Sequence, residues 1–549
     1  MAHSTSLSDQ STQAEKPKDL DAAPTSNSKM QTNRLETQDH QEAHQFWVIM
    51  ACNFLSLFIV ALDRTIVTTA IPKITDDFNS LGDIGWYGSA YMLTGATSQL
   101  IFGRIYKFYN MKWVFLTTMI IFEVGSVVCG AAPSSNAFIA GRAIAGFASA
   151  GLFSGCMLII IPLVPLHKRP MFQAMFGAVF GLASVMGPLI GGGFTSGITW
   201  RWCFYINLPI GAATWIFMAL VWHPVKVRRE SVPVKTHIKR LDPLGAFFLV
   251  PGIVCLLLAF QWGGSTYAWN DGRIIALFVL FGVLIMAFAS VQVLMPETAT
   301  IPARIITQRS ILASAIFTFC GVGSMMMVIY YVPIWFVAGF VGGGITKKSG
   351  YYVPVMILCP CILSIGLGLL STLKLDTDSS HWIAYQFLCG FGVGIGMQTG
   401  GLAVQRILPM SDVPVGIALL FFMQQLGGCI FTTVGQTILS NILISKLTGI
   451  PGIDPNLILS EGATKLVSIV APENIVVVQR AYNAACTKIF LASMGLTFGA
   501  LVSALGVEWK SIKEGKNGQD GPGGPGAGEP GGKKDKDMEM TKVSEQNGS

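Results

Sequence analysis

The chain has 549 residues, of which 52% are hydrophobic and only 12% are charged. Soluble globular proteins carry roughly 25% charged residues, so this composition excludes an ordinary soluble domain. The formal net charge is +7, but the basic residues lie in short loops rather than in one patch, and we therefore expect no nucleic-acid partner.

Thirteen long apolar segments follow one another between Phe46 and Trp509. Each has the length of about 20 residues that a helix needs to cross the hydrocarbon core of a bilayer. Only helices and closed barrels hide their backbone polar groups from lipid, so the pattern predicts an all-α polytopic membrane protein. The segments lie near 46–70, 85–105, 113–132, 137–163, 172–194, 202–222, 243–262, 273–295, 311–340, 351–373, 382–404, 413–444 and 487–508.

The loop charges predict a cytoplasmic amino terminus, because basic residues cluster after the second, fourth and sixth segments. An odd number of crossings then places Lys347 and Lys348 outside, whereas every later loop fits only if they are inside. The 37 residues between Arg309 and Lys347 are too few for two spans and a turn. Two short re-entrant helices, a frustrated topology or a lost helix would each explain this; we favour the lost helix.

These observations divide the chain into six parts. We expect disordered cytoplasmic tails at 1–44 and 510–549, a six-helix bundle at 45–223, a basic cytoplasmic linker at 224–242, an extra helix pair at 243–296, and a carboxy-terminal bundle at 297–509 that is one helix short near 336–348.

Three charged residues inside the apolar segments are candidates for chemistry. Asp63 lies deep in the first segment, where a carboxylate costs roughly 2.5–3.5 kcal/mol to insert. It is either a proton-binding site or a helix-end residue that faces water. Arg142, near the start of the fourth segment, is either its charge partner or an arginine that reaches the interface. Glu123, in the third segment, is either a second titrating site or a structurally paired residue.

Glycines and polar residues mark two further features. Gly181, Gly187, Pro188, Gly191 and Gly192 in the fifth segment predict close, bent helix packing. Six polar residues within segments either line a substrate path or form helix–helix hydrogen bonds: Asn53, Tyr91, Gln99, Gln398, Gln424 and Gln425. The chain shows no phosphate-binding loop, so we expect no ATP site and no cofactor, and no cluster with metal-ligand spacing or enzymatic nucleophile stands out.

Four motifs in chain order resemble those of the fourteen-span drug:proton antiporter branch of the major facilitator superfamily. Leu62–Pro72 is similar to its first-span motif, Arg142 with Gly146 and Gly151 to its fourth-span motif, and Gly187–Gly192 to its antiporter signature. Trp200–Gly211 closely resembles fungal toxin and multidrug efflux pumps. The resemblance covers about residues 45–508.

The chain departs from the family pattern twice. Lys107 stands where the superfamily carries Asp, which puts the usual gating salt bridge in doubt. The pattern also places a whole helix between Phe336 and Lys348, where the loop charges fail.

The resemblance implies two helical bundles with two extra central helices, and alternating access to a central cavity. It further implies a monomeric secondary transporter that exports an apolar organic compound in exchange for protons, with Asp63 as proton carrier and Arg142 as its partner. The expected location is the plasma membrane, with a vacuolar or vesicle membrane as the alternative. Uptake by symport, or a non-transporting or defective membrane protein, are the rival functions.

Overall fold

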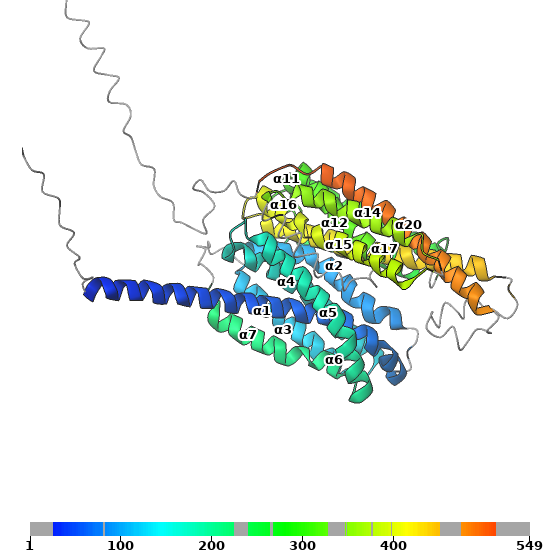
Figure 1. Cartoon of the computed structure of the whole chain (residues 1–549), viewed down its shortest axis with the longest axis horizontal. Coiled ribbons are helices and arrows are strands. Elements are labelled where there is room, and N and C mark those ends of the chain that lie inside the picture. Colours follow the sequence, from blue (N-terminus) through cyan, green and yellow to red (C-terminus); the bar gives the residue numbers. More distant parts are fainter. Residues whose placement is uncertain are drawn as a thin grey trace, which may run out of the picture.

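The computed structural model describes residues 26–78, 80, 83–223, 240–263, 267–327, 346, 349–374, 377–396, 398–448, 450 and 474–511. Within these ranges the chain is built from helices (Figure 1). Their bounds are α1 Ser26–Phe78, α2 Ile84–Phe108, α3 Met111–Gly130, α4 Ser135–Leu163, α5 Arg169–Gly197, α6 Trp202–Tyr205, α7 Asn207–Val221, α9 Pro243–Trp262, α10 Gly272–Leu294, α11 Ala303–Ile306, α12 Arg309–Met327, α14 Val353–Leu370, α15 Ser379–Gly396, α16 Thr399–Ile407, α17 Val413–Leu447 and α20 Ile475–Leu505.

The helices form two bundles. Helices α1 to α7 make the amino-terminal half, and α12 to α20 make the carboxy-terminal half, which lies above it in Figure 1. The halves meet mainly where α2 packs against α17, with α4 also touching α17. The paired helices α9 and α10 come between the halves in the chain, and α9 contacts both α2 and α17.

The described residues include twelve helices that are long and apolar enough to cross a membrane. Together with α2, a 25-residue helix packed between α4 and α17, they correspond one by one to the thirteen predicted segments. The predicted fold class is therefore confirmed. The segment near 336–348, where one helix is expected to be missing, lies outside the described residues apart from Thr346, as do Lys347 and Lys348.

Two helix boundaries differ from the sequence expectation. Helix α1 begins at Ser26, inside the tail that we expected to be disordered, because this segment is rich in good helix formers and extends a helix that the membrane span already nucleates. The sixth predicted span consists of α6 and α7, which meet at Ile206.

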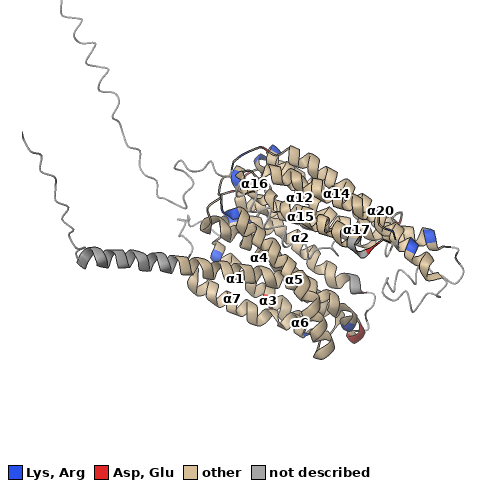
Figure 2. Cartoon of the chain, viewed as in Figure 1, with Lys and Arg blue, Asp and Glu red and all other residues tan. Residues whose placement is uncertain are grey.

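Polar side chains cap the amino-terminal ends of two membrane-length helices. Asn110 caps α3 by accepting the backbone N–H of Lys112 at 3.0 Å, and Asp271 caps α10 by accepting that of Arg273 at 2.8 Å. Lys, Arg, Asp and Glu gather at the helix ends, while the middles of the helices are almost uncharged on the face shown in Figure 2. This distribution is the one that a bilayer imposes.

Candidate functional site

A buried ion pair joins α1 to α4 in the amino-terminal half. The Asp63 and Arg142 side chains are 1% and 2% exposed, and Arg142 Nη1 lies 2.6 Å from Asp63 Oδ2. Asp63 Oδ1 has no hydrogen-bond partner among the described residues. The two residues singled out from the sequence are thus in direct contact, although 79 positions separate them.

Arg142 also holds helix α2. Its Nε donates to the backbone oxygen of Tyr87 at 3.0 Å, and its guanidinium carbon lies 4.4 Å from the centre of the Tyr91 ring. Because α2 packs against α17, the ion pair connects two helices of one half to the helix that faces the other half.

Glu123 occupies a different position from the pair. Both of its carboxylate oxygens are buried without a hydrogen-bond partner among the described residues. A Cβ placed on Gly211 of α7 would overlap the carboxylate, so the absence of a side chain there makes room for it. A carboxyl group without a buried partner is costly to keep charged in this setting.

The glycine motif of α5 packs on α1 beside Asp63. A Cβ at Gly187 would overlap the hydroxyl of Thr65, and one at Gly191 would overlap that of Thr69. The Thr65 hydroxyl donates to the Ala183 carbonyl of α5 at 3.0 Å, which fixes the close approach. Gly181 is buried within α5, Pro188 lies inside the same helix, and Gly192 has open space beside it.

The predicted path residues separate into two groups. In the amino-terminal half, Asn53 Nδ2 donates to the Cys156 carbonyl of α4 at 3.0 Å, Gln99 bonds to Ser154, and Tyr91 lies beneath Arg142. These contacts join helices within one half. Gln425 differs, because its amide nitrogen lies beside Gly95 of α2 at the boundary of the halves.

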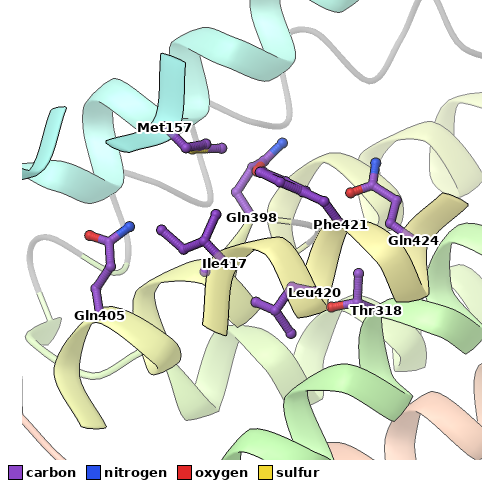
Figure 3. A pocket seen from close by; sticks show the side chains of 9 residues that line it. Met157, Thr318, Gln398, Gln405, Ile417, Leu420, Phe421 and Gln424 are labelled. Carbon is purple, nitrogen blue, oxygen red and sulfur yellow. The ribbon is translucent and has the colours of Figure 1, made fainter. Parts of the chain in front are cut away.

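Gln398 and Gln424 line a small cavity between the two halves (Figure 3). Helices α12, α16 and α17 and the residue before α16 form most of its wall, and Met157 of α4 covers it from the other half. The remaining lining residues are Thr318, Gly401, Gln405, Ile417, Leu420 and Phe421. Every lining residue is uncharged.

Sequence reasoning missed two glutamines near this cavity. Gln405 of α16 lines it, and Gln173 of α5 places its amide nitrogen beside the lining residue Gly401. They are 6% and 1% exposed. A polar amide within an apolar segment was the available signal for both.

An ion cluster joins the halves at the predicted cytoplasmic end. Lys107, at the end of α2, lies 2.6 Å from Asp412, and Arg304 of α11 lies 2.5 Å from the other oxygen of the same carboxylate. Burial opposes ionisation of Asp412, but the hydrogen bonds and charges of Lys107 and Arg304 outweigh it, so the pKa of this carboxyl lies below its usual value.

This cluster, which we call the Asp412 latch, bears on one expectation from the sequence. Lys107 was expected to leave the gating salt bridge in doubt. A salt bridge is present, but the base stands on α2 and the acid stands before α17. A second bond, from Arg169 of α5 to Gln405 at 3.2 Å, also joins the halves at this end.

Comparison with known proteins gives the family of this chain. The model of the Major Facilitator Superfamily matches residues 54–432. This chain belongs to the major facilitator superfamily. This chain is 44% identical over 511 residues to the efflux pump aflT of Aspergillus parasiticus, and the alignment covers 88% of this chain and 99% of the relative.

Two further comparisons agree with the assignment. The MFS-type transporter VdtG of Byssochlamys spectabilis is 46% identical over 495 residues, covering 86% of this chain and 89% of the relative. The solved structure of the proton:xylose symporter XylE, bound to 6-bromo-6-deoxy-D-glucose, superposes with a TM-score of 0.52 at 12% identity, covering 86% of this chain and 98% of that chain. This last likeness shows the fold alone.

The alignments also show a shortfall in this superfamily member. The alignment with aflT has 511 positions but covers only 88% of the 549 residues of this chain. About 28 aligned positions of aflT therefore have no residue of this chain opposite them. The same comparison with VdtG gives about 23. A deficit of this size corresponds to one membrane-spanning helix, which needs about 20 residues. Its predicted place near 336–348 stays a prediction.

Proposed function

We propose that this transporter exports an apolar organic compound in exchange for protons. The observation that carries the proposal is the buried pair of Asp63 and Arg142, in which one carboxylate oxygen is open to a proton. The name of the relative aflT supports the outward direction. The substrates are one organic molecule and the proton, and the working unit is a monomer in the plasma membrane.

The geometry suggests how protonation of Asp63 changes the contact between the two halves. A proton on Asp63 removes the negative charge that faces Arg142 at 2.6 Å. The guanidinium then keeps only the Tyr87 carbonyl and the Tyr91 ring, both on α2. Release of α1 from α4 thereby changes the position of the helix that meets α17.

The α5 motif transmits the same event within the amino-terminal half. Gly187 and Gly191 pack against Thr65 and Thr69, so any shift of α1 at Asp63 moves α5 with it. Glu123 provides a second proton-binding carboxyl in this half, since its oxygens lack partners among the described residues.

The test is transport by the full chain in proteoliposomes under an imposed pH gradient. We expect Asp63→Asn to abolish gradient-driven accumulation of an uncharged fluorescent apolar probe, Nile red, and to retain its exchange without a gradient. The matched control is Asp271→Asn, which removes a carboxylate that caps α10 outside the span. Equal gradient-driven transport by native protein and Asp63→Asn would refute the coupling role.

The direction of flux separates the alternatives. Export requires the probe to move against the proton flow, whereas symport moves both the same way. If the native chain produces neither flux above the level of empty liposomes, the protein is a membrane protein without transport activity.

A further inference from the structure

We infer that Asp242 and Arg104 are positioning residues that fasten the extra helix pair, α9 and α10, to the amino-terminal half, so that the pair moves with α2 when the halves separate. The proposed transport function gives this pair no role. The inference rests on that function in one respect, the relative movement of the two halves. We call the contact the Asp242 knot, which consists of Arg104, Asp242, Gln292, Thr300 and Ile301.

The carboxylate of Asp242 joins three segments into one body. Asp242 is 2% exposed, and its Oδ1 accepts the backbone N–H of Gly245 at 2.8 Å, which caps α9. Its Oδ2 accepts the amide of Gln292 on α10 at 2.7 Å, and both the backbone N–H and the hydroxyl of Thr300 at 2.8 and 2.7 Å. Hydrogen bonds to a carboxylate are the strong ones, so α9, α10 and the segment after α10 hold together here.

The backbone of Asp242 shows that this position is specified by its surroundings. Within the part of the chain that the structure describes, it is the one residue other than glycine with a left-handed backbone, at φ 52°. Such a conformation persists only where the contacts around it fix it. The four hydrogen bonds to its carboxylate supply that constraint.

Arg104 of α2 binds this body at both of its ends. Arg104 is 2% exposed, and its Nε donates at 3.1 Å to the carbonyl of Arg240, which precedes α9. Its Nη2 donates to the same carbonyl and, at 3.0 Å, to the carbonyl of Thr298, which follows α10. The ring of Phe108 on α2 also lies 4.9 Å from the guanidinium carbon of Arg104 and 5.4 Å from that of Arg240. One buried side chain of the amino-terminal half therefore holds the pair where the chain enters it and where the chain leaves it.

Elsewhere the pair is packed more loosely against its neighbours. A cavity of about 100 Å³ lies where α9 meets α2 and α17, with Leu257 and Phe260 of α9 and Thr432 of α17 among its lining residues. Atoms that line a cavity lack packing partners on that side, so the attachment of α9 is weak at this level toward both helices. The firm attachment is the knot, and the knot holds α2.

The chain passes from this body to the carboxy-terminal half within three residues. The N–H of Ile301 donates to Gln292 Oε1 at 3.0 Å, so Ile301 still belongs to the body. Helix α11 begins at Ala303 and packs against α12 of the other half. Hinge motions are absorbed by a few residues in such connections. The structure therefore assigns the hinge to the segment from Ile301 to Ala303, around Pro302.

Spin labels on the pair and on both halves test which half the pair follows. Noncanonical amino acids carry the labels at Met286 of α10, Trp113 of α3 and Met410 before α17, which are 63%, 63% and 61% exposed. Pulsed distance measurements on the full chain in nanodiscs compare the native protein with Lys107→Asp, which places a second carboxylate against Asp412. We expect both distances to Met410 to lengthen and the distance between Met286 and Trp113 to stay constant. A constant distance between Met286 and Met410 while the halves separate would overturn the inference.

Two substitutions separate the attachment to α2 from the cohesion of the body. Arg104→Met removes the bonds to α2 and leaves those of Asp242, so the distance distribution between Met286 and Trp113 should broaden about twofold, and Arg104→Lys, which keeps a charged donor, should broaden it less. In Asp242→Asn one acceptor atom becomes a donor that faces other donors, although asparagine tolerates the left-handed backbone. Amides that bond to the carboxylate should then exchange their hydrogens about tenfold faster, the effect of one lost hydrogen bond on local stability.

The matched control is Asp271→Asn, the same substitution at the other end of the pair, where the carboxylate accepts the N–H of Arg273. It should leave the distance distribution and the exchange at Thr300 at their native values. A native width in Arg104→Met, or equal broadening in Asp271→Asn and Asp242→Asn, would overturn the inference. If the halves do not separate in Lys107→Asp, the movement assumed by the proposed function fails, and the width in Arg104→Met still decides whether the knot holds the pair to α2.

Discussion

Removal of the Lys107 charge should open the cytoplasmic end of the transporter. In the structure this ammonium lies 2.6 Å from Asp412, whose side chain is 1% exposed, while Lys107 is 16% exposed. Lys107→Met keeps the length of the side chain and removes its charge. The halves then lose their ion pair at this end, because Arg304 lies on α11, which packs against α12 of the carboxy-terminal half that also carries Asp412.

The magnitude follows from the burial of the pair. Unit charges 2.6 Å apart attract by about 6 kcal/mol at an effective dielectric constant of about 20, and desolvation offsets part of this. Breaking a buried pair costs about 3–5 kcal/mol. Arg304 still faces Asp412 after the substitution, so the carboxylate keeps one partner and the loss is smaller than for a fully broken pair. Because Arg304 is 61% exposed, it offsets only part of that loss. We therefore expect a loss of about 2 kcal/mol, or about a thirtyfold shift toward the cytoplasm-open state.

Spin labels on the two halves report this equilibrium. Trp113 at the start of α3 and Met410 before α17 are 63% and 61% exposed, so labels there disturb little packing. Noncanonical amino acids carry the labels, so the native cysteines stay in place. Pulsed distance measurements on the full chain in nanodiscs should show a longer distance population in Lys107→Met.

A charge exchange decides whether the ion pair is the cause. Lys107→Asp should open the cytoplasmic end further than Lys107→Met, since two carboxylates then face each other. Lys107→Asp combined with Asp412→Lys should restore the short distance. If all three proteins keep the native distance, or if the exchange fails to restore it, the latch does not hold the halves together.

Three further predictions follow from other contacts. Because the pKa of Asp412 lies below its usual value, the latch is fully formed above about pH 4 and is lost only as the pH falls through the lowered pKa. In a chain whose Asp63 and Glu123 carboxylates are replaced by amides, the spin-label distance should therefore stay constant from pH 8 to pH 5. Opening within that window would contradict the role of Asp412 in the latch. Gly187→Ala should overlap α1, cost about 1–3 kcal/mol and lower the thermal midpoint in detergent, whereas Gly192→Ala, with nothing within 4 Å, should be neutral. Gly211→Ala should destabilise by overlap with the carboxylate of Glu123, and Glu123→Ala in the same chain should relieve it; additive losses in the thermal midpoint would count against this packing.

Much of the fold could be predicted from composition and periodicity. Apolar runs of membrane length predicted the helices, because the bilayer acts on every segment separately. The side on which each loop lies stays a prediction from the loop charges. The alignment deficit of about one helix agrees in size with the conflict that loop charges reveal at Lys347. Helix α1 was less predictable, since its continuation to Ser26 depends on propagation from the span.

The candidate site was only partly predictable. The cost of a charge in the membrane marked Asp63 and Arg142 without any knowledge of their partners. Asp412 gave a weaker signal, an acid before a span on a side rich in basic residues. Gln173 and Gln405 resembled other amides within the spans.

The sequence by itself determined that this is a helical membrane transporter with a costly carboxylate in its first span. Only the tertiary structure decided what each polar group meets. Lys107 and Asp412 are 305 positions apart, and Arg169 and Gln405 are 236 apart. Such pairs form through the packing of whole helices across two halves, and no local pattern along the chain specifies that packing.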